Sequence, residues 1–384
     1  MEILSDPGMF LALFAVSFGI CGAIVLARPW LVRNLRAAED LLSIQCAHLR
    51  HTPRIGGLGV LVAAVAGMLV LVPEHPGLPF GLFALTLVPV FLAGIAEDLG
   101  WRVSARGRLI AAATSAALAV GLLGVWIPPL GIPGLDALLA MAPLAIVVTV
   151  LWATGVCHAL NLIDGVNGLA GGTALLIAAG IALVAQEAGV SAIAMVAAGV
   201  GAAVLGFLVF NWPLGRIFLG DAGAYSLGHV LVWLAIGLAW ISPEVSALSL
   251  SLMFFWPVAD TILAITRRLH NGRSVSAPDR LHYHQFVMRA LILLSGGRLG
   301  KGIANSATGL LILPLVAAPI ATAVHFWDRP MAALLAWGVF GLLFTLSYLG
   351  GLRLFRSNLW RGIPRARRAA NAQLVPVPAV LRKF

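Results

Sequence analysis

The chain has 384 residues and a formal net charge of +10; 60% of its residues are apolar, 10% are charged, and the mean hydropathy is +0.99. Soluble domains carry about 25% charged residues, so this composition excludes a water-soluble globular protein. The apolar residues would fill about eleven spans of about 20 residues each. They form continuous runs, which excludes the alternating strands of a membrane β-barrel. The sequence therefore predicts an all-α, polytopic integral membrane protein.

The cysteines and the first apolar run exclude two further possibilities. Cys21, Cys46 and Cys157 have no CxxC spacing, so they indicate neither a disulfide framework nor a thiolate metal site. The first apolar run follows Glu2 and Asp6 rather than a basic segment. We therefore expect it to be a retained helix and not a cleaved signal.

Eleven apolar runs are bounded by charges or by Pro and Gly clusters. They cover residues 8–28, 55–73, 79–96, 109–127, 137–155, 168–187, 192–211, 223–241, 246–265, 306–326 and 331–349. With the N-terminus outside, 24 of the 25 Lys and Arg residues fall on one face, and Arg329 is the exception. Basic residues favour the cytoplasmic side, so we expect a cytoplasmic C-terminus. Residues 1–350 then form a single transmembrane domain, and residues 351–384 form a basic tail on anionic lipid headgroups.

Eight acidic residues lie on the predicted inner face. Carboxylates at membrane depth are costly and are candidates for function. These eight residues are Glu39, Asp40, Glu97, Asp98, Asp164, Asp221, Asp260 and Asp279.

Two polar clusters follow predicted spans. Glu97-Asp98 precedes several arginines, including Arg106 and Arg108; a helix-end acid pair neutralised by arginines explains this cluster equally well. The segment NLIDGVNG begins at Asn161, and its spacing of three puts two amides and a carboxylate on one face of a helix turn. A glycine-rich bend would explain the glycines but not these aligned polar groups.

Two more clusters occur further along the chain. FNWP is followed by RIFLGDAG, in which Asp221 opens the eighth span, so helix capping alone is an alternative for this carboxylate. The last inner loop contains DRLHYHQ, where His282 and His284 have an HxH spacing that would also suit a transition metal. The neighbouring arginines favour phosphate instead. Oxygen ligands suit Mg²⁺, so the four clusters together predict a Mg²⁺-diphosphate site at the lipid–cytosol boundary.

The segments HTPRIGG, NLIDGVNGLAGG, FNWPLGRIFLGDAGAYSLG and PDRLHYHQ resemble the motifs of the polyprenyl-phosphate N-acetylhexosamine-1-phosphate transferases, glycosyltransferase family 4. The resemblance spans residues 52–285, on inner loops only. It implies transfer of a sugar-1-phosphate from a UDP-N-acetylhexosamine to undecaprenyl phosphate in the bacterial inner membrane, with release of UMP and initiation of O-antigen or other cell-envelope glycans. Eleven spans resemble this glycan-initiating branch more than the ten-span phospho-N-acetylmuramoyl-pentapeptide transferases, which stay as the alternative.

The resemblance also implies individual roles. Asn161 and Asp221 match the Mg²⁺ ligands, with Mn²⁺ as a substitute; Phe218 matches the aromatic that stacks on uracil, and Asn167 a contact to the uracil edge. The expected catalytic residues are Glu97, Asp98, Asp164 and Asp221. The expected substrate-binding residues are Asn161, Asn167, Asn211, Phe218, Arg216, Arg280, His282, His284, Arg106 and Arg108.

Five positions depart from the family pattern. Glu97 replaces an Asp, His158 an Asn, Asn167 an Asp, Arg106 a Lys and Gln285 a His. Each exchange keeps a polar group, so the resemblance still implies an active enzyme, with an unusual sugar preference.

Charge favours a one-step reaction over a covalent intermediate. The polyprenyl phosphate is mostly dianionic at neutral pH and needs little deprotonation, so we expect direct attack with Asp98 as a positioning group or base. The rival in another class is a transporter or flippase, which would carry charges at the bilayer midplane rather than at the inner helix ends. We expect membrane lipids and no nucleic acid as partners, and leave a homodimer open.

Overall fold

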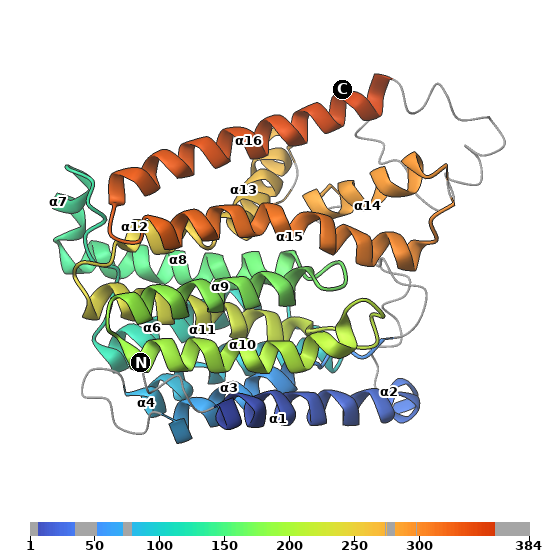
Figure 1. Ribbon diagram of the computed structural model, residues 1–384, viewed down its shortest axis with the longest axis horizontal. Helices are drawn as coiled ribbons and strands as arrows, with labels where there is room; N and C mark the ends of the chain where they lie inside the picture. The colour runs from blue at the N-terminus through green and yellow to red at the C-terminus, as the bar shows by residue number, and fades with distance from the viewer. Residues whose placement is uncertain are drawn as a thin grey trace.

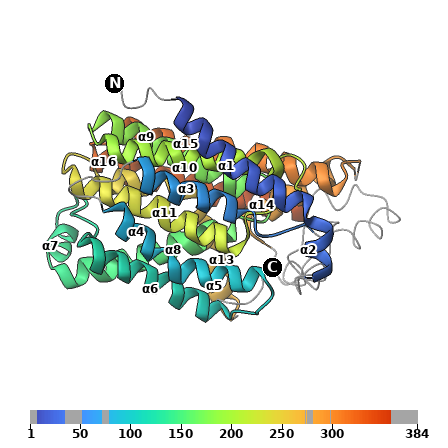
Figure 2. The same cartoon turned by 90° about the horizontal axis from the view of Figure 1, so that it is seen from below.

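The computed structural model describes residues 7–34, 52–71, 79–272, 274, 281–296 and 298–357. Within these ranges every regular element is a helix and no strand is present, which confirms the all-α prediction. The long helices lie roughly side by side along the longest axis (Figure 1), and the view from below shows several layers of them (Figure 2).

The helices follow one another in a simple order. They are α1 (Pro7–Leu26), α2 (Arg28–Asn34), α3 (Gly57–Leu71), α4 (Phe80–Thr86), α5 (Val88–Asp98), α6 (Ala105–Leu123), α7 (Leu135–Leu139), α8 (Ala142–Leu162), α9 (Leu169–Glu187), α10 (Ser191–Asn211), α11 (Gly220–Ile241), α12 (Ala247–Leu252), α13 (Phe255–His270), α14 (Tyr283–Leu294), α15 (Lys301–His325) and α16 (Pro330–Ser357).

Eight of these helices are long and apolar enough to cross a membrane, so the chain is a multi-pass membrane protein. They are α1, α6, α8, α9, α10, α11, α15 and α16. The pair α4 and α5, bent by 41° at their junction, makes a ninth span if it is counted as one. The two other predicted spans correspond to α3, which has 15 described residues, and to the broken pair α12 and α13.

The fifth predicted span, residues 137–155, begins five residues before α8 (Ala142–Leu162) and ends seven residues before it does. Residues Leu135–Leu139 form the separate short helix α7, and α8 starts at Ala142 with Pro143 in its first turn. Proline suits the first turn of a helix because its missing N–H has no partner to lose there. The helix boundary is therefore set by Pro143 and not by the start of the apolar run.

Helix α11 lies at the centre of the bundle. Its membrane-spanning window is 89% buried, compared with 22% for α1 and for α16. Small residues let its neighbours approach: a Cβ on Gly57 of α3 would lie 2.1 Å from the Gly223 Cα, and one on Gly94 of α5 would lie 2.4 Å from the Ala222 Cα. Such small-residue contacts are typical of membrane helix packing. They bring α3 and α5 against the first turn of α11, where Asp221 lies.

The described residues of the four predicted polar clusters lie at one end of the bundle. Helices α2 and α14 mark this end in Figure 1, and α7 marks the opposite end. Here the last turns of α5, α8 and α10 meet the first turns of α6, α9 and α11. Residues that are distant in the sequence are thereby gathered into a single polar site.

Candidate active site

The first turn of α11 is capped by a carboxylate from another helix. No side chain of the residue preceding α11 caps it. Instead, Asp98 at the end of α5 accepts hydrogen bonds from the backbone N of Asp221 and of Ala222, each 2.9 Å long. A negative charge at a helix N-terminus is favourable because it satisfies unpaired N–H groups. Gly220 has φ +77°, and a Cβ there would lie 1.7 Å from the Arg54 carbonyl oxygen, so this turn requires glycine.

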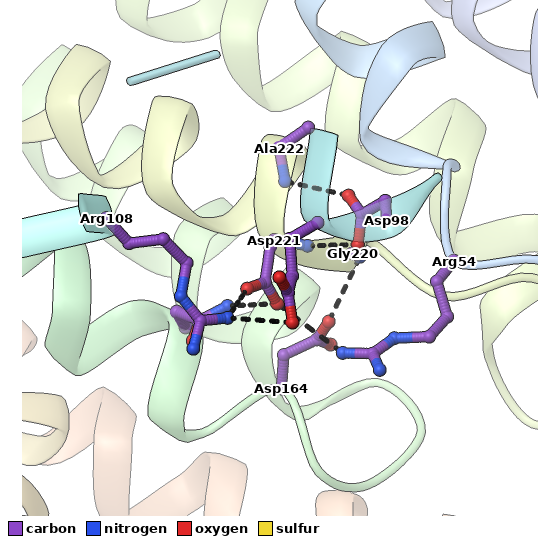
Figure 3. Close-up of polar contacts among 9 residues, drawn as sticks. Arg54, Asp98, Arg108, Asp164, Gly220, Asp221 and Ala222 are labelled. Atoms are coloured by element: carbon purple, nitrogen blue, oxygen red, sulfur yellow. Dashed lines mark hydrogen bonds and ion pairs between the residues drawn. The ribbon is translucent and has the colours of Figure 1, made fainter. Parts of the chain in front are cut away.

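Asp221 is buried between two arginines. Arg108 of α6 pairs with its Oδ2, and the Arg54 Nη2 lies 3.4 Å from its Oδ1. Figure 3 shows the two guanidinium groups approaching the carboxylate from different sides. Glu97 lies 3.7 Å from the Arg108 Nη1. Two guanidinium groups therefore flank the buried carboxylate of Asp221.

The predicted Asn161 and Asp164 lie against the same turn of α11. The Asn161 Nδ2 donates to the Asp221 Oδ1 over 3.1 Å, and the Gly220 N donates to the Asp164 Oδ2 over 3.3 Å. Burial of its carboxylate raises the pKa of Asp164 to about 6, although the Arg54 guanidinium acts in the opposite direction. The structure thus brings together Glu97, Asp98, Arg108, Asn161, Asp164 and Asp221 from four helices and a loop.

Asn167 and Asn211 brace the loops around this cluster. Asn167 donates from its Nδ2 to the Pro213 O and the Ser306 Oγ, each over 3.1 Å. Asn211 is buried, and both ends of its amide bond to the backbone. Its Oδ1 accepts from the Gly168 N over 2.7 Å, and its Nδ2 donates to the Ile217 O over 2.9 Å. Asn211 therefore holds two loops together, while its predicted contact with a substrate stays a prediction.

Phe218 is fixed through its backbone. Its N donates to the Pro53 O and its O accepts from the Gly56 N, both over 2.9 Å, which joins the HTPRIGG segment to the start of α11. The ring is half-buried.

A cavity of about 850 Å³ lies beside these loops. Arg216, which is exposed, lines it together with Thr52, Asn167 and Trp212. Asn305 of α15 also lines the cavity. The Asn167 Oδ1 and the Asn305 Nδ2 have no hydrogen-bond partner within the described part of the chain.

The two predicted histidines lie at the start of α14, next to the loop that contains Asp164. His282 Nδ1 is 3.2 Å from the Asp260 Oδ2 of α13. His284 packs against Gly165, where a Cβ would lie 2.4 Å from its Nε2. Burial lowers the pKa of His284 to about 4, so its ring is neutral at neutral pH. The contact of its Nε2 with Gly165 packs the His284 ring against the loop that carries Asp164, and its predicted role in phosphate binding stays a prediction.

One predicted arginine lies away from the cluster, and another cannot be compared with it. Arg106 is exposed, two residues from Arg108 on α6, so it points to another face of the helix. Arg280 lies outside the described residues. Conversely, Arg54 and Asp260 are not among the site residues that the sequence predicts. A signal for each is present in the sequence, because Arg54 lies in the HTPRIGG segment and Asp260 is one of the eight inner acids.

Comparison with known proteins identifies the family. Residues 80–239 match glycosyl transferase family 4. The chain is 30% identical over 256 residues to a probable undecaprenyl-phosphate N-acetylglucosaminyl 1-phosphate transferase of Bacillus subtilis, covering 65% of this chain and 70% of the relative. The chain belongs to glycosyl transferase family 4.

Two further relatives represent different branches. An undecaprenyl-phosphate alpha-N-acetylglucosaminyl 1-phosphate transferase of Yersinia pestis is 25% identical over 295 residues, which are 75% of this chain and 77% of the relative. A phospho-N-acetylmuramoyl-pentapeptide-transferase of Symbiobacterium thermophilum is 30% identical over 311 residues, 74% of this chain and 90% of the relative. Membership of family 4 is thus common to both branches and does not by itself select the sugar.

Proposed function

We propose that this family 4 protein transfers N-acetylglucosamine-1-phosphate, or a related sugar-1-phosphate, from a UDP-sugar to undecaprenyl phosphate and releases UMP. The observation that supports this most directly is the position of Asp221: it is buried at a helix N-terminus, beside Asn161 and between two arginines. The relatives named for N-acetylglucosamine transfer support this branch. We reserve the pentapeptide transfer named for the Symbiobacterium relative as the second candidate.

The residues at the site fit a Mg²⁺ ion. No cluster of three or more His, Cys, Asp and Glu groups able to hold a metal occurs among the described residues. Mg²⁺ does not require one, because it commonly takes one or two protein oxygens and completes its shell with substrate phosphates and waters. Asp221 and Asn161 would provide those two oxygens. The bound ion would supply charge neutralisation and alignment of the two phosphates.

The arginines of this chain would bind the diphosphate. Arg108 and Arg54 now pair with Asp221, and planar guanidinium groups form paired hydrogen bonds with phosphate oxygens as readily as with carboxylates. Since phosphoryl transfer depends mainly on positioning and charge neutralisation, two cations beside the reacting phosphates are suited to the reaction. We assign to Arg108 and Arg54 the stabilisation of charge that builds up on the leaving UMP.

We assign to Asp98 a positioning role. Each of its oxygens accepts a backbone hydrogen bond, so a covalent bond from either oxygen to phosphorus would disturb the cap of α11. The acceptor phosphate is mostly dianionic at neutral pH and is a competent nucleophile without a strong base. This supports direct attack over a covalent aspartyl intermediate.

The cavity beside the 212–216 loop suits the nucleoside part of the donor. Asn167 and Asn305 line it, and their amide groups carry both acceptor and donor atoms, the pair that the imide edge of uracil requires. Its volume of about 850 Å³ lies within the range of ligand pockets. Arg216 at its edge adds a positive charge for the phosphates.

We further propose eleven spans in the bacterial inner membrane, with the N-terminus outside. The positions of the eleven helical regions and the nearly complete segregation of Lys and Arg onto one face support this arrangement. The active site would then face the cytoplasm, where nucleotide sugars are made.

A donor panel tests the proposal directly. Purified protein in nanodiscs, supplied with undecaprenyl phosphate and Mg²⁺, should release UMP from UDP-N-acetylglucosamine, and EDTA should stop the release. UDP-N-acetylgalactosamine and UDP-N-acetylmuramoyl-pentapeptide in parallel reactions distinguish the two branches. Turnover of the pentapeptide donor alone would replace the main proposal by the second candidate.

A further inference from the structure

A buried carboxylate holds residues 281–284, where the chain enters α14. We refer to these four residues as the histidine elbow. Asp260 of α13 is 1% exposed; its Oδ1 accepts from the Tyr283 N over 3.0 Å, and its Oδ2 lies 3.2 Å from the His282 Nδ1. The His284 Nδ1 is 3.9 Å from the same Oδ2. One side chain therefore fixes both the backbone and the first ring of the elbow.

Helix α16 holds the elbow from the other side. The Tyr348 OH donates to the Leu281 O over 3.0 Å, and the Tyr283 OH donates to the Ser347 Oγ over 3.0 Å. The Arg267 Nη1 of α13 donates to the Tyr348 OH, also over 3.0 Å. Helices α13 and α16 thus share a polar network whose common element is the elbow.

Aromatic packing around Tyr283 makes this junction rigid. Its ring centroid lies 4.9 Å from that of Trp256 on α13 and 5.1 Å from that of Phe344 on α16. Edge and tilted contacts at these distances are favourable aromatic geometries. Because membrane helices gain little from hydrophobic association, such packing and hydrogen bonding supply the specificity of the junction.

The contact with Asp260 also determines what His282 can do. A carboxylate accepts a proton donor, so the Nδ1 of His282 carries its hydrogen toward Asp260 and the ring is held in one orientation. His282 is 3% exposed, and no residue in the described ranges bonds its Nε2, so this nitrogen is the one polar atom of the ring without a partner there. The stacked His284 ring, 5.7 Å away and inclined by 14°, limits rotation of His282 further.

We propose that Asp260 is a positioning residue for the sugar-nucleotide transfer: it orients His282 toward the diphosphate of the donor, and Tyr348 of α16 is its counterpart on the opposite side of the elbow. This inference rests on the proposed function. It makes the last described helix part of the active-site scaffold. For histidines that bind a metal, a partner that orients the ring in this way commonly accounts for about 10- to 100-fold in affinity or activity, and we expect an effect at the lower end of that range here.

A double-mutant cycle tests the proposal. Asp260→Asn keeps an acceptor for the Tyr283 N but presents an amide to His282, so we expect kcat/KM for UDP-N-acetylglucosamine to fall about tenfold. In a His282→Ala background the same change should cost less than about twofold, because the residue through which Asp260 acts is missing. Equal losses in both backgrounds would mean that Asp260 supports the fold only, and would overturn the inference.

Milder and matched variants keep the test decisive. Tyr348→Phe removes one hydroxyl and should reduce kcat/KM about threefold, again without further loss in the His282→Ala background; it carries the test if Asp260→Asn does not fold. Thr266→Ala and Thr345→Val are the controls on α13 and α16, because each threonine hydroxyl bonds only carbonyls of its own helix. Both controls should retain wild-type turnover and thermal stability.

The wild-type measurements separate this inference from the proposed function. A wild-type protein that neither releases UMP nor binds UDP-N-acetylglucosamine by calorimetry overturns the proposed function and this inference with it. An active wild-type protein whose Asp260→Asn and Tyr348→Phe variants keep full kcat/KM overturns the inference alone.

Discussion

Asp98 and Asp221 come from different helices, yet the carboxylate of the first caps the helix that the second begins. Asp98 uses both oxygens, one on the Asp221 N and one on the Ala222 N, at 2.9 Å each. The backbone of Asp221 is thereby fixed while its side chain turns to Arg108 and Arg54. Two neighbouring carboxylates thus have separate tasks: one holds the turn, and the other faces the cations.

Asp98→Asn should therefore reduce both stability and turnover. An asparagine has one acceptor oxygen, whereas two backbone N–H groups bond to Asp98. Loss of a helix cap lowers the free energy of unfolding by about 0.5–2 kcal/mol. We expect a lower melting temperature and a kcat reduced by about 100-fold or more at every pH between 6 and 9. Glu97→Asp is the control and should be mild, since it shortens a half-buried acid that lies 3.7 Å from Arg108.

A general base would behave differently. If Asp98 removed a proton from the lipid phosphate, the loss in Asp98→Asn would be concentrated at low pH, where the monoanionic acceptor predominates. If it were a nucleophile, delipidated enzyme with UDP-sugar alone would release about one equivalent of UMP. Either result would contradict the positioning role that we assign to Asp98.

Asp221→Ala should abolish turnover without unfolding the protein. The substitution leaves the backbone N–H that Asp98 caps, so the first turn of α11 keeps its hydrogen bonds. It removes the carboxylate that lies between the two arginines, and with it the proposed Mg²⁺ ligand. We expect kcat to fall by about 10³-fold or more, a loss of the size that follows removal of a charge-stabilising group in phosphoryl transfer. Near-normal turnover at saturating donor would return Asp221 to a purely structural role.

The positions of the helices were largely predictable from the sequence, whereas their breaks were not. The runs 8–28 and 192–211 lie within two residues of α1 and α10. The runs 79–96 and 246–265, by contrast, each contain two helices separated by a break, at Leu87 and at residues 253–254. Hydrophobicity reports the environment of a segment and not its hydrogen bonding, so a bend inside an apolar run leaves no signal.

Most of the residues that form the site were predictable, because the polar clusters follow or precede apolar runs at the same end of the helices. The hydrogen bonds and ion pairs between these residues were not predictable. Nothing in the spacing of Asp98 and Asp221 indicates a cap between them, and nothing near His282 indicates Asp260. These contacts depend on how α5 packs on α11 and on how α13 packs on the elbow. Local sequence patterns do not predict tertiary packing of this kind.

Asp164 should give the enzyme an acidic limb in its pH profile. Its pKa is raised to about 6 by burial, so the carboxylate loses its charge as the pH falls through 6. We expect kcat/KM to decline below about pH 6 in the wild-type protein, where the acceptor phosphate also gains a proton, and this decline to be less steep in Asp164→Asn. The exposed Glu187, at the opposite end of the bundle, provides the control: Glu187→Gln should leave the profile unchanged.

The same shift has a consequence for stability. A carboxyl group with a pKa of about 6 in the folded protein and about 3.9 in the unfolded chain binds its proton more tightly when folded. Ionisation therefore opposes folding, and stability declines as the pH rises from about 4 through 6. Asp164→Asn should remove this decline and raise the melting temperature at pH 7.5. A melting temperature that falls instead would show that the charged carboxylate contributes more through the Gly220 N than its burial costs.

Phe218→Ala should weaken donor binding while leaving the loop in place. The backbone bonds of Phe218 to Pro53 and Gly56 do not involve its ring, so the path of the chain into α11 should be retained. Stacking of a base on an aromatic side chain contributes about 1–3 kcal/mol, which corresponds to at least about a fivefold rise in KM for the UDP-sugar. Phe218→Tyr keeps the aromatic face and should restore the wild-type KM. An unchanged KM in Phe218→Ala would place the base elsewhere.

Gly165→Ala should damage the active site through His284 rather than through the backbone. A Cβ at residue 165 would lie 2.4 Å from the His284 Nε2, closer than non-bonded atoms approach, so either the histidine elbow or the loop that carries Asp164 must move. We expect kcat to fall about tenfold or more, because displacements of about 1 Å near reacting groups are costly. Gly155→Ala, on α8, is the matched control: a Cβ there meets nothing within 4 Å, and replacing glycine inside a helix should if anything stabilise it. If Gly165→Ala is as active as Gly155→Ala, the elbow and the Asp164 loop move independently. If His284→Ala in the Gly165→Ala background recovers turnover, the loss arises from the steric contact itself.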